Sequence, residues 1–306
     1  MQRTIDYLFE KIGALNPIHG KKLKKNIDAM DDRYYDRAEL FFNQYHRILQ
    51  LENKTLDYSI DCYLQMIADV NSETVEFLRT GKYTSSTFEE VNNRVYGRPE
   101  TMAYYMHGLI LSQFLWRHHY QMFDYFIGRL PLYRPVTKSY LEVGVGHGFY
   151  LSHVLRILDE TTSITAVDIS ETSLALAKRF INDSRIDYNL KDIFEFNDGK
   201  KYDFITLGEV LEHVEQPLEL LLKLNELLSE DGTLFFTTPT NAPAIDHIYL
   251  FNNVDEIRDL IEQAGFTIES ELSLLSEEVS PEKAAKFKIT ILYGAFLKKA
   301  KTKKNG

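Results

Sequence analysis

The feature that most constrains this chain is a change of pattern near residue 139. Beyond it, short apolar runs alternate with longer segments of helical periodicity. Alternating strands and helices favour parallel strands joined by right-handed crossovers, which predicts a doubly wound α/β sheet. We predict strands at 140–143, 164–167, 187–190, 204–207, 233–237, 266–275 and 288–297. The intervening helices are predicted at 149–158, 173–181, 217–228 and 254–264.

The first 135 residues show helical periodicity without strand-like alternation, so they predict an all-α region. Helices are expected at about 1–15, 34–51, 56–68, 74–78 and 100–130, the last being the longest, with a turn at Asn71-Ser72. Pro131 and Pro135 cannot both lie inside a regular helix. We therefore predict a helical substrate-binding or cover domain at 1–135, an α/β domain at 136–297 and a basic tail at 298–306.

Net charge narrows the range of partners. The chain holds 35 Lys and Arg against 45 Asp and Glu, a net charge of −10, and the excess of acid lies after residue 135. Proteins that bind nucleic acid usually present a basic face, so we expect no nucleic-acid partner. Thirteen of the 19 tyrosines lie before residue 136. They suit a small-molecule pocket, although for any single tyrosine packing of a helical domain, with the hydroxyl group at its surface, is the more common explanation.

Cysteine usage and hydropathy bear on location. Cys62 is the only cysteine, which excludes a disulfide within the chain and fits a reducing cytoplasm. No apolar run approaches the roughly 18 residues that a membrane span needs, and the first 15 residues lack the apolar core of a signal peptide. We therefore expect a cytoplasmic protein with a small-molecule substrate and no membrane partner. No sequence feature decides whether the chain forms a homodimer.

The most informative motif is a glycine-rich loop between the first predicted strand and the helix after it. Gly144, Gly146 and Gly148 stand there in Gly-x-Gly-x-Gly spacing. Glycines at such a turn let the backbone approach a ligand closely, with helix N–H groups pointing at it. The dinucleotide fingerprint needs its third glycine one residue later, where this chain has Phe149.

Two carboxylates near the loop describe the ligand further. Glu142 precedes the loop, where it would repel a pyrophosphate but suit a cationic group. Asp168 ends the next predicted strand, 20 residues after Gly148, a distance that suits a carboxylate accepting hydrogen bonds from a ribose. Asp168 could instead cap the following helix, but Ser170 and Thr172 already offer that role. The ligand described has a ribose, a positive group and no phosphate.

In the order of these motifs, residues 136–297 resemble the class I S-adenosylmethionine (SAM) methyltransferases, in the branch similar to the ubiquinone-pathway O-methyltransferases. The resemblance rests also on Asp192-Ile193 and on the segment 208–217, which matches the family segment after strand four. It implies a Rossmann-like, seven-stranded, mostly parallel sheet with SAM as the cofactor. The cofactor-binding residues that it implies are Glu142, Gly144, Gly146, Gly148, Asp168, Ile169, Asp192, Ile193 and Glu209.

Methyl transfer is an SN2 displacement, so an enzyme must align the nucleophile and exclude water, and it needs a base only if the nucleophile carries a proton to be lost. His213 is the best single catalytic candidate, although its ring could equally pack beside the cofactor or cap a loop. His247 and Tyr104 are further catalytic candidates. In the helical region, Arg98 could hold a carboxylate of SAM or of an acceptor. Tyr105 and His107 complete the predicted substrate residues.

A metal site is an alternative use of the same segment. Glu209, Glu212 and His213 form Glu-x-x-Glu-His, and His247 could return to the same pocket. This pattern resembles the small-RNA 2′-O-methyltransferases, in which two Glu and two His hold Mg²⁺. A hard cation would suit the carboxylates and polarise paired substrate hydroxyls. We do not favour Mg²⁺, because many SAM enzymes with Glu-His here bind no metal and the acidic chain argues against an RNA substrate.

The leading hypothesis is a SAM-dependent methyltransferase that modifies an oxygen or nitrogen of a small metabolite or natural product. Two alternatives stay open at this point. The same motifs would serve aminocarboxypropyl transfer or cyclisation of SAM, each releasing methylthioadenosine. The chain could also bind SAM as a non-catalytic scaffold, although such proteins usually lose the loop glycines or the ribose acid, which are all present here.

Overall fold

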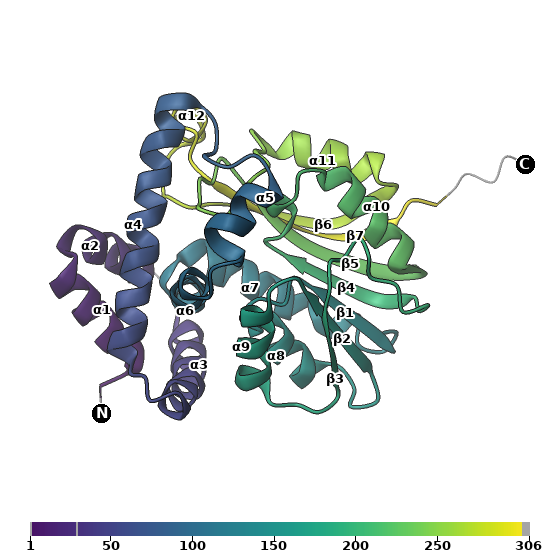
Figure 1. Ribbon diagram of the computed structural model, residues 1–306, viewed down its shortest axis with the longest axis horizontal. Helices are drawn as coiled ribbons and strands as arrows, with labels where there is room; N and C mark the ends of the chain where they lie inside the picture. Colours follow the sequence, from purple (N-terminus) through teal and green to yellow (C-terminus); the bar gives the residue numbers. More distant parts are fainter. Residues whose placement is uncertain (1, 29, 302–306) are drawn as a thin grey trace, which may run out of the picture.

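Seven strands form one sheet within the part of the chain that this computed structural model describes, residues 2–28 and 30–301 (Figure 1). The strand order is β3-β2-β1-β4-β5-β7-β6. Strands β1 to β5 pair in parallel, whereas β7 runs antiparallel to both β5 and β6. The predicted seven-stranded, mostly parallel, Rossmann-like sheet is therefore confirmed. The strands are β1 (Ser139–Val143), β2 (Ser163–Asp168), β3 (Ile186–Leu190), β4 (Tyr202–Gly208), β5 (Leu228–Thr240), β6 (Phe266–Leu275) and β7 (Ile291–Lys299).

Helices cover both faces of the sheet because successive strand residues point to opposite sides. Tyr140, Phe204 and Phe235 pack on one face with α7, α8 and α9. Leu141 and Ile205 pack on the other face with α10 and α11. These helices are α7 (Arg117–Arg129), α8 (Phe149–Ile157), α9 (Glu171–Ile181), α10 (Pro217–Leu227) and α11 (Val254–Gln263).

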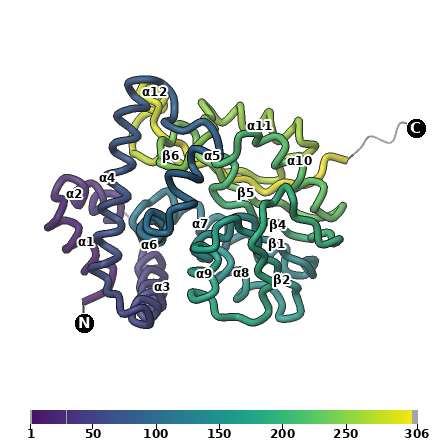
Figure 2. The backbone as a smooth tube through the Cα atoms, viewed as in Figure 1, coloured from purple at the N-terminus to yellow at the C-terminus, as the bar shows by residue number. Residues whose placement is uncertain are grey.

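The N-terminal helices gather beside the sheet, shown from purple to blue in Figure 2. Their apolar core continues into the α/β part: Phe41 and Phe114 lie 4.9 and 5.7 Å, between ring centroids, from Phe149 of α8. The two parts therefore share buried surface. The helices are α1 (Thr4–Leu15), α2 (Pro17–Ile27), α3 (Asp32–Leu51), α4 (Leu56–Thr80), α5 (Phe88–Val91) and α6 (Pro99–Leu115), with a π-helical turn η1 (Asn92–Tyr96) before α6.

Helix α4 corrects the prediction of two helices separated by a turn at Asn71-Ser72, because it runs unbroken through that point. The hydroxyl of Ser72 donates to the carbonyl of Ala68, and that of Thr74 to the carbonyl of Val70. The polar side chains that suggested a turn are thus satisfied along the helix itself. The helix ends instead at Gly81, whose φ of +73° terminates it in the left-handed region.

The predicted long helix 100–130 is also corrected, since it divides at Trp116 into α6 and α7. Trp116 has extended backbone, and its indole N–H donates to the hydroxyl of Tyr63, 2.8 Å away. Beyond the break, Phe126 of α7 lies 4.6 Å, between ring centroids, from Phe235 of β5. Helix α7 therefore packs on the sheet, although it precedes the two prolines at which we placed the domain boundary.

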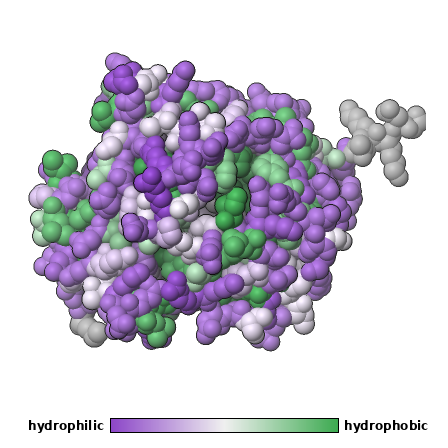
Figure 3. All heavy atoms as spheres, viewed as in Figure 1, coloured by the Kyte–Doolittle hydropathy of each residue, from purple (hydrophilic) through white to green (hydrophobic). Residues whose placement is uncertain are grey.

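The C-terminal strands β7 and β6 form one edge of the sheet. A short helix, α12 (Pro281–Lys286), lies in the connection between β6 and β7. Of the predicted basic tail, Lys298 and Lys299 belong to β7, and residues 302–306 lie outside the described residues. Among residues 2–28 and 30–301, no helix combines the length and apolar character needed to cross a membrane. The face shown in Figure 3 is mostly hydrophilic, with hydrophobic residues along a hollow between the N-terminal helices and the sheet.

Candidate active site

A cavity of about 1170 Å³ lies between the carboxyl ends of the parallel strands and the N-terminal helices. Residues at the ends of β1, β2, β4 and β5 line one wall, and residues of α4 and α6 line another. Pockets for one drug-sized ligand are usually about 300–1,000 Å³. This cavity therefore has room for a cofactor and an acceptor together, at the edge where doubly wound sheets bind their ligands.

The glycine loop forms part of the cavity wall, and its shape requires glycine. Gly144, Gly146 and Gly148 have φ angles of +69°, +52° and +78°. A Cβ on Gly144 would lie 2.3 Å from Cγ2 of Val210, so no larger residue fits there. Gly148 does not line the cavity; it precedes α8, and a Cβ there would meet Ile181 at 3.0 Å. The backbone conformation and the close packing thus require glycine, and without side chains at these positions the backbone of the loop can approach a ligand.

Asp168 is held rigidly at the cavity beside this loop. Its two carboxylate oxygens accept hydrogen bonds from the backbone N–H groups of Gly146 and Ser170, at 2.9 and 2.8 Å. Helix α9 is capped by Ser170, whose hydroxyl accepts from Ser173 N. Asp168 therefore does not serve as the helix cap, and its remaining lone pairs are available to a ligand in the cavity.

Glu142 is buried on the cavity wall next to the loop. Its carboxylate accepts a hydrogen bond from the hydroxyl of Tyr140 at 2.6 Å. Burial raises the pKa of Glu142 to about 8. A cationic ligand group would stabilise the ionised carboxylate, which agrees with the ligand that the sequence describes.

The remaining predicted cofactor residues come directly after β2, β3 and β4. Ile169, Asp192 and Ile193 all line the cavity, and Ile169 is half exposed. Asp192 accepts a hydrogen bond from the backbone N–H of Phe194 at 2.9 Å, which fixes the turn after β3. Glu209 also lines the cavity. The structure thus brings every predicted cofactor residue except Gly148 to one cavity.

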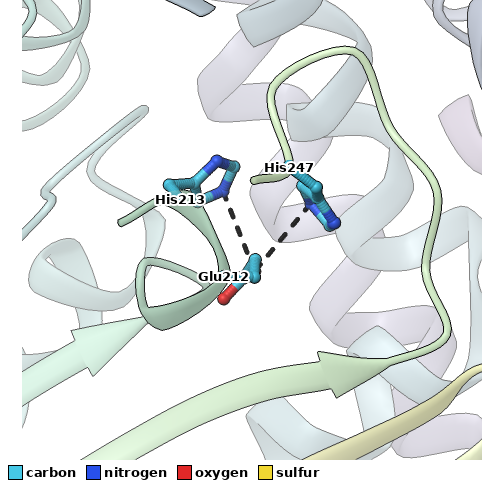
Figure 4. A group of neighbouring side chains, drawn as sticks. All are labelled: Glu212, His213 and His247. Atoms are coloured by element: carbon cyan, nitrogen blue, oxygen red, sulfur yellow. Dashed lines mark ion pairs between the residues drawn. The ribbon is translucent and has the colours of Figure 1, made fainter. Parts of the chain in front are cut away.

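A second group of polar side chains lies where β4 and β5 end, and Figure 4 shows its three members turned toward one another. Glu212 and His213 come from a short 3₁₀ turn, η3 (Leu211–His213), and His247 comes from the loop after β5. Glu212 Oε1 lies 3.8 Å from His213 Nε2 and 4.0 Å from His247 Nε2. The predicted return of His247 to the pocket of His213 is therefore seen in the structure.

The hydrogen bonds of His213 define its protonation pattern. Nδ1 lies 2.8 Å from the backbone carbonyl oxygen of Asp246, which can only accept. Nδ1 must therefore carry a proton, and in the neutral ring Nε2 keeps its lone pair on the side of Glu212. The Asp246 side chain is itself held by the hydroxyl of Tyr105, which donates to Oδ1 at 3.0 Å.

Ionisation is costly for the carboxyl group of Glu212 and for that of the neighbouring Glu209. Glu212 is fully buried, and only Oε2 has a partner, the hydroxyl of Thr238 at 2.9 Å. Burial and the neighbouring Glu209 raise the pKa of Glu212 well above its ordinary value. Burial raises the pKa of Glu209 to about 7, and its Oε1 also lacks a hydrogen-bond partner within the described residues. Burial lowers the pKa of His247 to about 4.

This arrangement fits a metal ion in part. Glu212, His213 and His247 offer ligand atoms that all lie within 4.8 Å of one another, and Glu212 Oε1 and His247 Nδ1 have no partner among the described residues. Glu209, the fourth predicted ligand, is not in that group. One carboxylate and two imidazoles suit a transition metal better than Mg²⁺, which prefers oxygen ligands.

Three residues predicted from the helical region lie away from the cavity, which corrects those expectations. The hydroxyl of Tyr104 donates to Asp69 at 2.7 Å, on the face of α6 opposite to the site. Arg98 is exposed and donates to the carbonyl of Asn93. His107 is buried among helices with Tyr45 OH 2.6 Å from its Nδ1. Tyr105 does line the cavity, but its hydroxyl is occupied by Asp246, so it supports the site through that residue.

The segment 83–96 supplies contacts that sequence reasoning missed. The hydroxyl of Tyr83 accepts from Ala242 N at 2.9 Å, and the hydroxyl of Tyr96 lies 3.0 Å from His213 Nδ1. The backbone N–H of Phe88 donates to Glu215 at 2.8 Å. Tyr96 is presented by the π-helical turn η1, a rare conformation that often marks functional sites. The segment 83–96 of the helical region is thus bonded to two connections around the site, the one between β4 and α10 and the one after β5.

Comparisons with known proteins bear on the family. A family model described as "Methyltransferase domain" matches residues 115–271, just over half of the chain. A ubiquinone biosynthesis O-methyltransferase of Actinobacillus pleuropneumoniae serotype 5b (strain L20) is 32% identical over 109 residues, which are 33% of this chain and 45% of that protein. One of Coxiella burnetii (strain Dugway 5J108-111) is 35% identical over 104 residues, 33% of this chain and 43% of that protein. The chain therefore spans less than half the length of these curated relatives.

A solved structure supports the fold over more of the chain. The mitomycin 7-O-methyltransferase MmcR superposes with a TM-score of 0.53 at 12% sequence identity, covering 76% of this chain and 68% of that one. At such low identity the likeness concerns the fold alone. The covered share exceeds the α/β part, so the shared architecture extends into the N-terminal helices.

Proposed function

This chain belongs to the family of SAM-dependent methyltransferase domains, and from that premise we propose that it transfers the methyl group of SAM to an oxygen of a small molecule. The single observation that carries the proposal is the shared cavity. It joins the glycine loop and Asp168, which suit SAM, to His213 and its carboxylate neighbours, which suit an acceptor. Its volume of about 1170 Å³ accommodates both ligands in one cavity.

An oxygen acceptor is favoured over nitrogen by the presence of a base. A neutral amine attacks a sulfonium methyl group without first losing a proton, whereas a hydroxyl group gains greatly from a base. His213 offers Nε2 as that base, since Nδ1–H is held by the carbonyl of Asp246. The curated relatives, which are named O-methyltransferases, support the same choice over the third of the chain that they match.

In the proposed mechanism, the glycine loop and Asp168 would hold the ribose and amino-acid parts of SAM, in the cavity that His213 also lines. The acceptor hydroxyl donates a hydrogen bond to His213 Nε2 and passes its proton there as the oxygen attacks the methyl carbon. S-adenosylhomocysteine (SAH) then leaves as a neutral thioether. The walls contributed by α4 and α6 exclude water, which would otherwise compete for the methyl group.

A metal-assisted variant rests on the unpartnered donors of Glu212 and His247. A divalent ion bound by Glu212, His213 and His247 would lower the pKa of an acceptor hydroxyl and supply the activation otherwise given by the base. Activity that survives exhaustive chelation and dialysis would exclude this variant. Activity restored by Mn²⁺ or Zn²⁺ more than by Mg²⁺ would agree with the nitrogen-rich ligand set.

The decisive experiment incubates the full chain with SAM, with and without a pool of small metabolites, and follows products by mass spectrometry. We expect SAH only when metabolites are present, together with a product heavier by one methylene group. The His213→Gln variant should bind SAM but form product far more slowly than the wild type. Methylthioadenosine released from SAM would contradict methyl transfer and indicate attack on the amino-acid arm of the cofactor.

A further inference from the structure

The proposed function leaves one charged group of SAM without a partner. Its amino-acid end carries an ammonium and a carboxylate on a single carbon atom. Glu142 suits the ammonium group, but the residue predicted for the carboxylate, Arg98, is exposed and bonded to Asn93. No arginine lies among the cavity-lining residues in the part of the chain that the structure describes. A side-chain donor for the carboxylate is therefore sought among the other residues that line the cavity.

The three lysines that line the cavity are engaged or placed elsewhere. Lys22 pairs with Glu277 at 2.6 Å, in the wall formed by α2 and the connection between β6 and β7. Lys191 immediately precedes Asp192, in the turn after β3. Lys288 lies with its Nζ 5.3 Å from the centre of the Phe77 ring, near the end of α4. None of them is part of the glycine loop.

His147, in contrast, stands inside the glycine loop and lines the cavity. The backbone N–H of Phe149 donates to its Nδ1 at 3.2 Å, so Nδ1 carries no proton. The neutral ring must therefore carry its proton on Nε2. Burial lowers the pKa of His147 to about 4, so the ring is neutral near pH 7. Within the described residues Nε2 makes no hydrogen bond, so this residue of the cavity wall has an N–H group that is not engaged by the protein.

We propose that the Nε2–H of His147 donates a hydrogen bond to the α-carboxylate of SAM. Glu142 lies five residues earlier, near the end of β1, and both residues line the same cavity. Because the ammonium and carboxylate groups share one carbon atom, their partners are expected on one stretch of the cavity wall, and Glu142 and His147 both lie in the short stretch from the end of β1 to the start of α8. The inference rests on the proposed function only in that SAM is the ligand.

The test compares SAM with decarboxylated SAM, which keeps the sulfonium and ammonium groups but lacks the carboxylate. Both affinities are measured by calorimetry for the wild-type chain and for His147→Phe, which keeps a ring but has no N–H. A hydrogen bond to a charged group is typically worth a factor of about 10–100 in affinity. We expect His147→Phe to weaken SAM binding by about that factor and to change decarboxylated SAM binding by less than about threefold.

Two further variants make the result specific. His147→Gln keeps an N–H donor and should recover most of the preference for SAM over decarboxylated SAM. His153→Phe is the matched control, since His153 lies on α8 between Phe123 and Phe149 and outside the cavity. Equal losses for the two ligands in His147→Phe, or no loss for SAM, would overturn the assignment. A wild-type chain that binds neither ligand would instead overturn the proposed function.

Discussion

The α/β part and the helical part of this protein line the same cavity, yet their functional residues differ in how they are specified. In the α/β part, side chains reach the cavity because strands end there, so position in the sequence almost fixes position in space. In the helical part, Tyr104 and Tyr105 are adjacent in the chain, but only Tyr105 lines the cavity. The comparison teaches that strand ends locate a site directly, whereas a helix locates it only once its packed face is known.

The largest effect should come from substitution of His213. A large loss of activity would show that the α/β part supplies the catalytic base. Replacing His213 with Gln removes the base, and general-base catalysis typically contributes about 10²- to 10⁴-fold. We expect kcat for the acceptor found in the metabolite pool to fall by that range, with SAM affinity changed by less than about threefold. The steady-state rate of SAH formation at saturating substrates measures the first quantity, and calorimetry measures the second. An unchanged kcat would remove His213 from the mechanism.

The next effect concerns Asp168, which the local sequence predicts as a ligand contact. Asp168→Asn keeps the shape but exchanges one acceptor oxygen for an N–H group facing the backbone donors of Gly146 or Ser170. Lost charge-assisted hydrogen bonds cost about 1.5–3 kcal/mol, so SAM should bind about 10- to 100-fold more weakly. Ser170→Ala is the control: it removes the α9 cap and lowers stability, but affinity should hold. Equal affinity losses in both variants would mean that Asp168 acts only through the fold.

A smaller effect, dependent on pH, should come from Glu142. Its pKa is raised by burial from 4.5 to about 8, so its protonated form stabilises the ligand-free fold below pH 4.5. That contribution is lost as pH rises through 8. The free energy of unfolding, measured with denaturant, should therefore fall between pH 5.5 and pH 8.5 by ~1–3 kcal/mol less in Glu142→Gln than in the wild type. Parallel pH profiles for the two proteins would show that the carboxylate is solvated or already paired.

The smallest effects should separate the adjacent tyrosines of the helical part. Tyr105→Phe removes the hydroxyl that holds Asp246 and should lower kcat several-fold, by about 1 kcal/mol in activation free energy. Tyr104→Phe removes only the bond to Asp69 and should leave both kcat and SAM affinity unchanged. Equal kcat values in the two variants would mean that the helical part shapes the cavity without positioning Asp246.

Much of the fold could be predicted because its causes are local. The strands after residue 139 are recognisable from short apolar runs, and every predicted strand overlaps an observed one. The break at Trp116 could not be predicted, since its cause is a hydrogen bond to Tyr63, 53 residues earlier. The continuity of α4 depends on hydroxyl groups that bond along the helix, whereas the same residue types more often favour turns.

For the site, the sequence locates cavity residues where a motif marks a strand end, and it misses them where two segments must meet. Glu142, Asp168 and Asp192 lie at or just after the ends of predicted strands, and all three line the cavity. Tyr96 is missed because its role depends on a π-helical turn, and a Tyr-Gly-Arg-Pro sequence indicates only a turn. Asp246 contributes through its backbone carbonyl, to which side-chain chemistry gives no clue.

The aromatic contacts of Phe149 have a consequence for how the protein can be divided. Phe41 and Phe114 of the helical part pack against this first residue of α8, which directly follows the glycine loop. A fragment cut at the prolines near residue 135 would expose that apolar face to water and remove the support of the loop. Such a fragment should aggregate or bind cofactor poorly, even though every motif that identifies the family chemistry would still be present in its sequence.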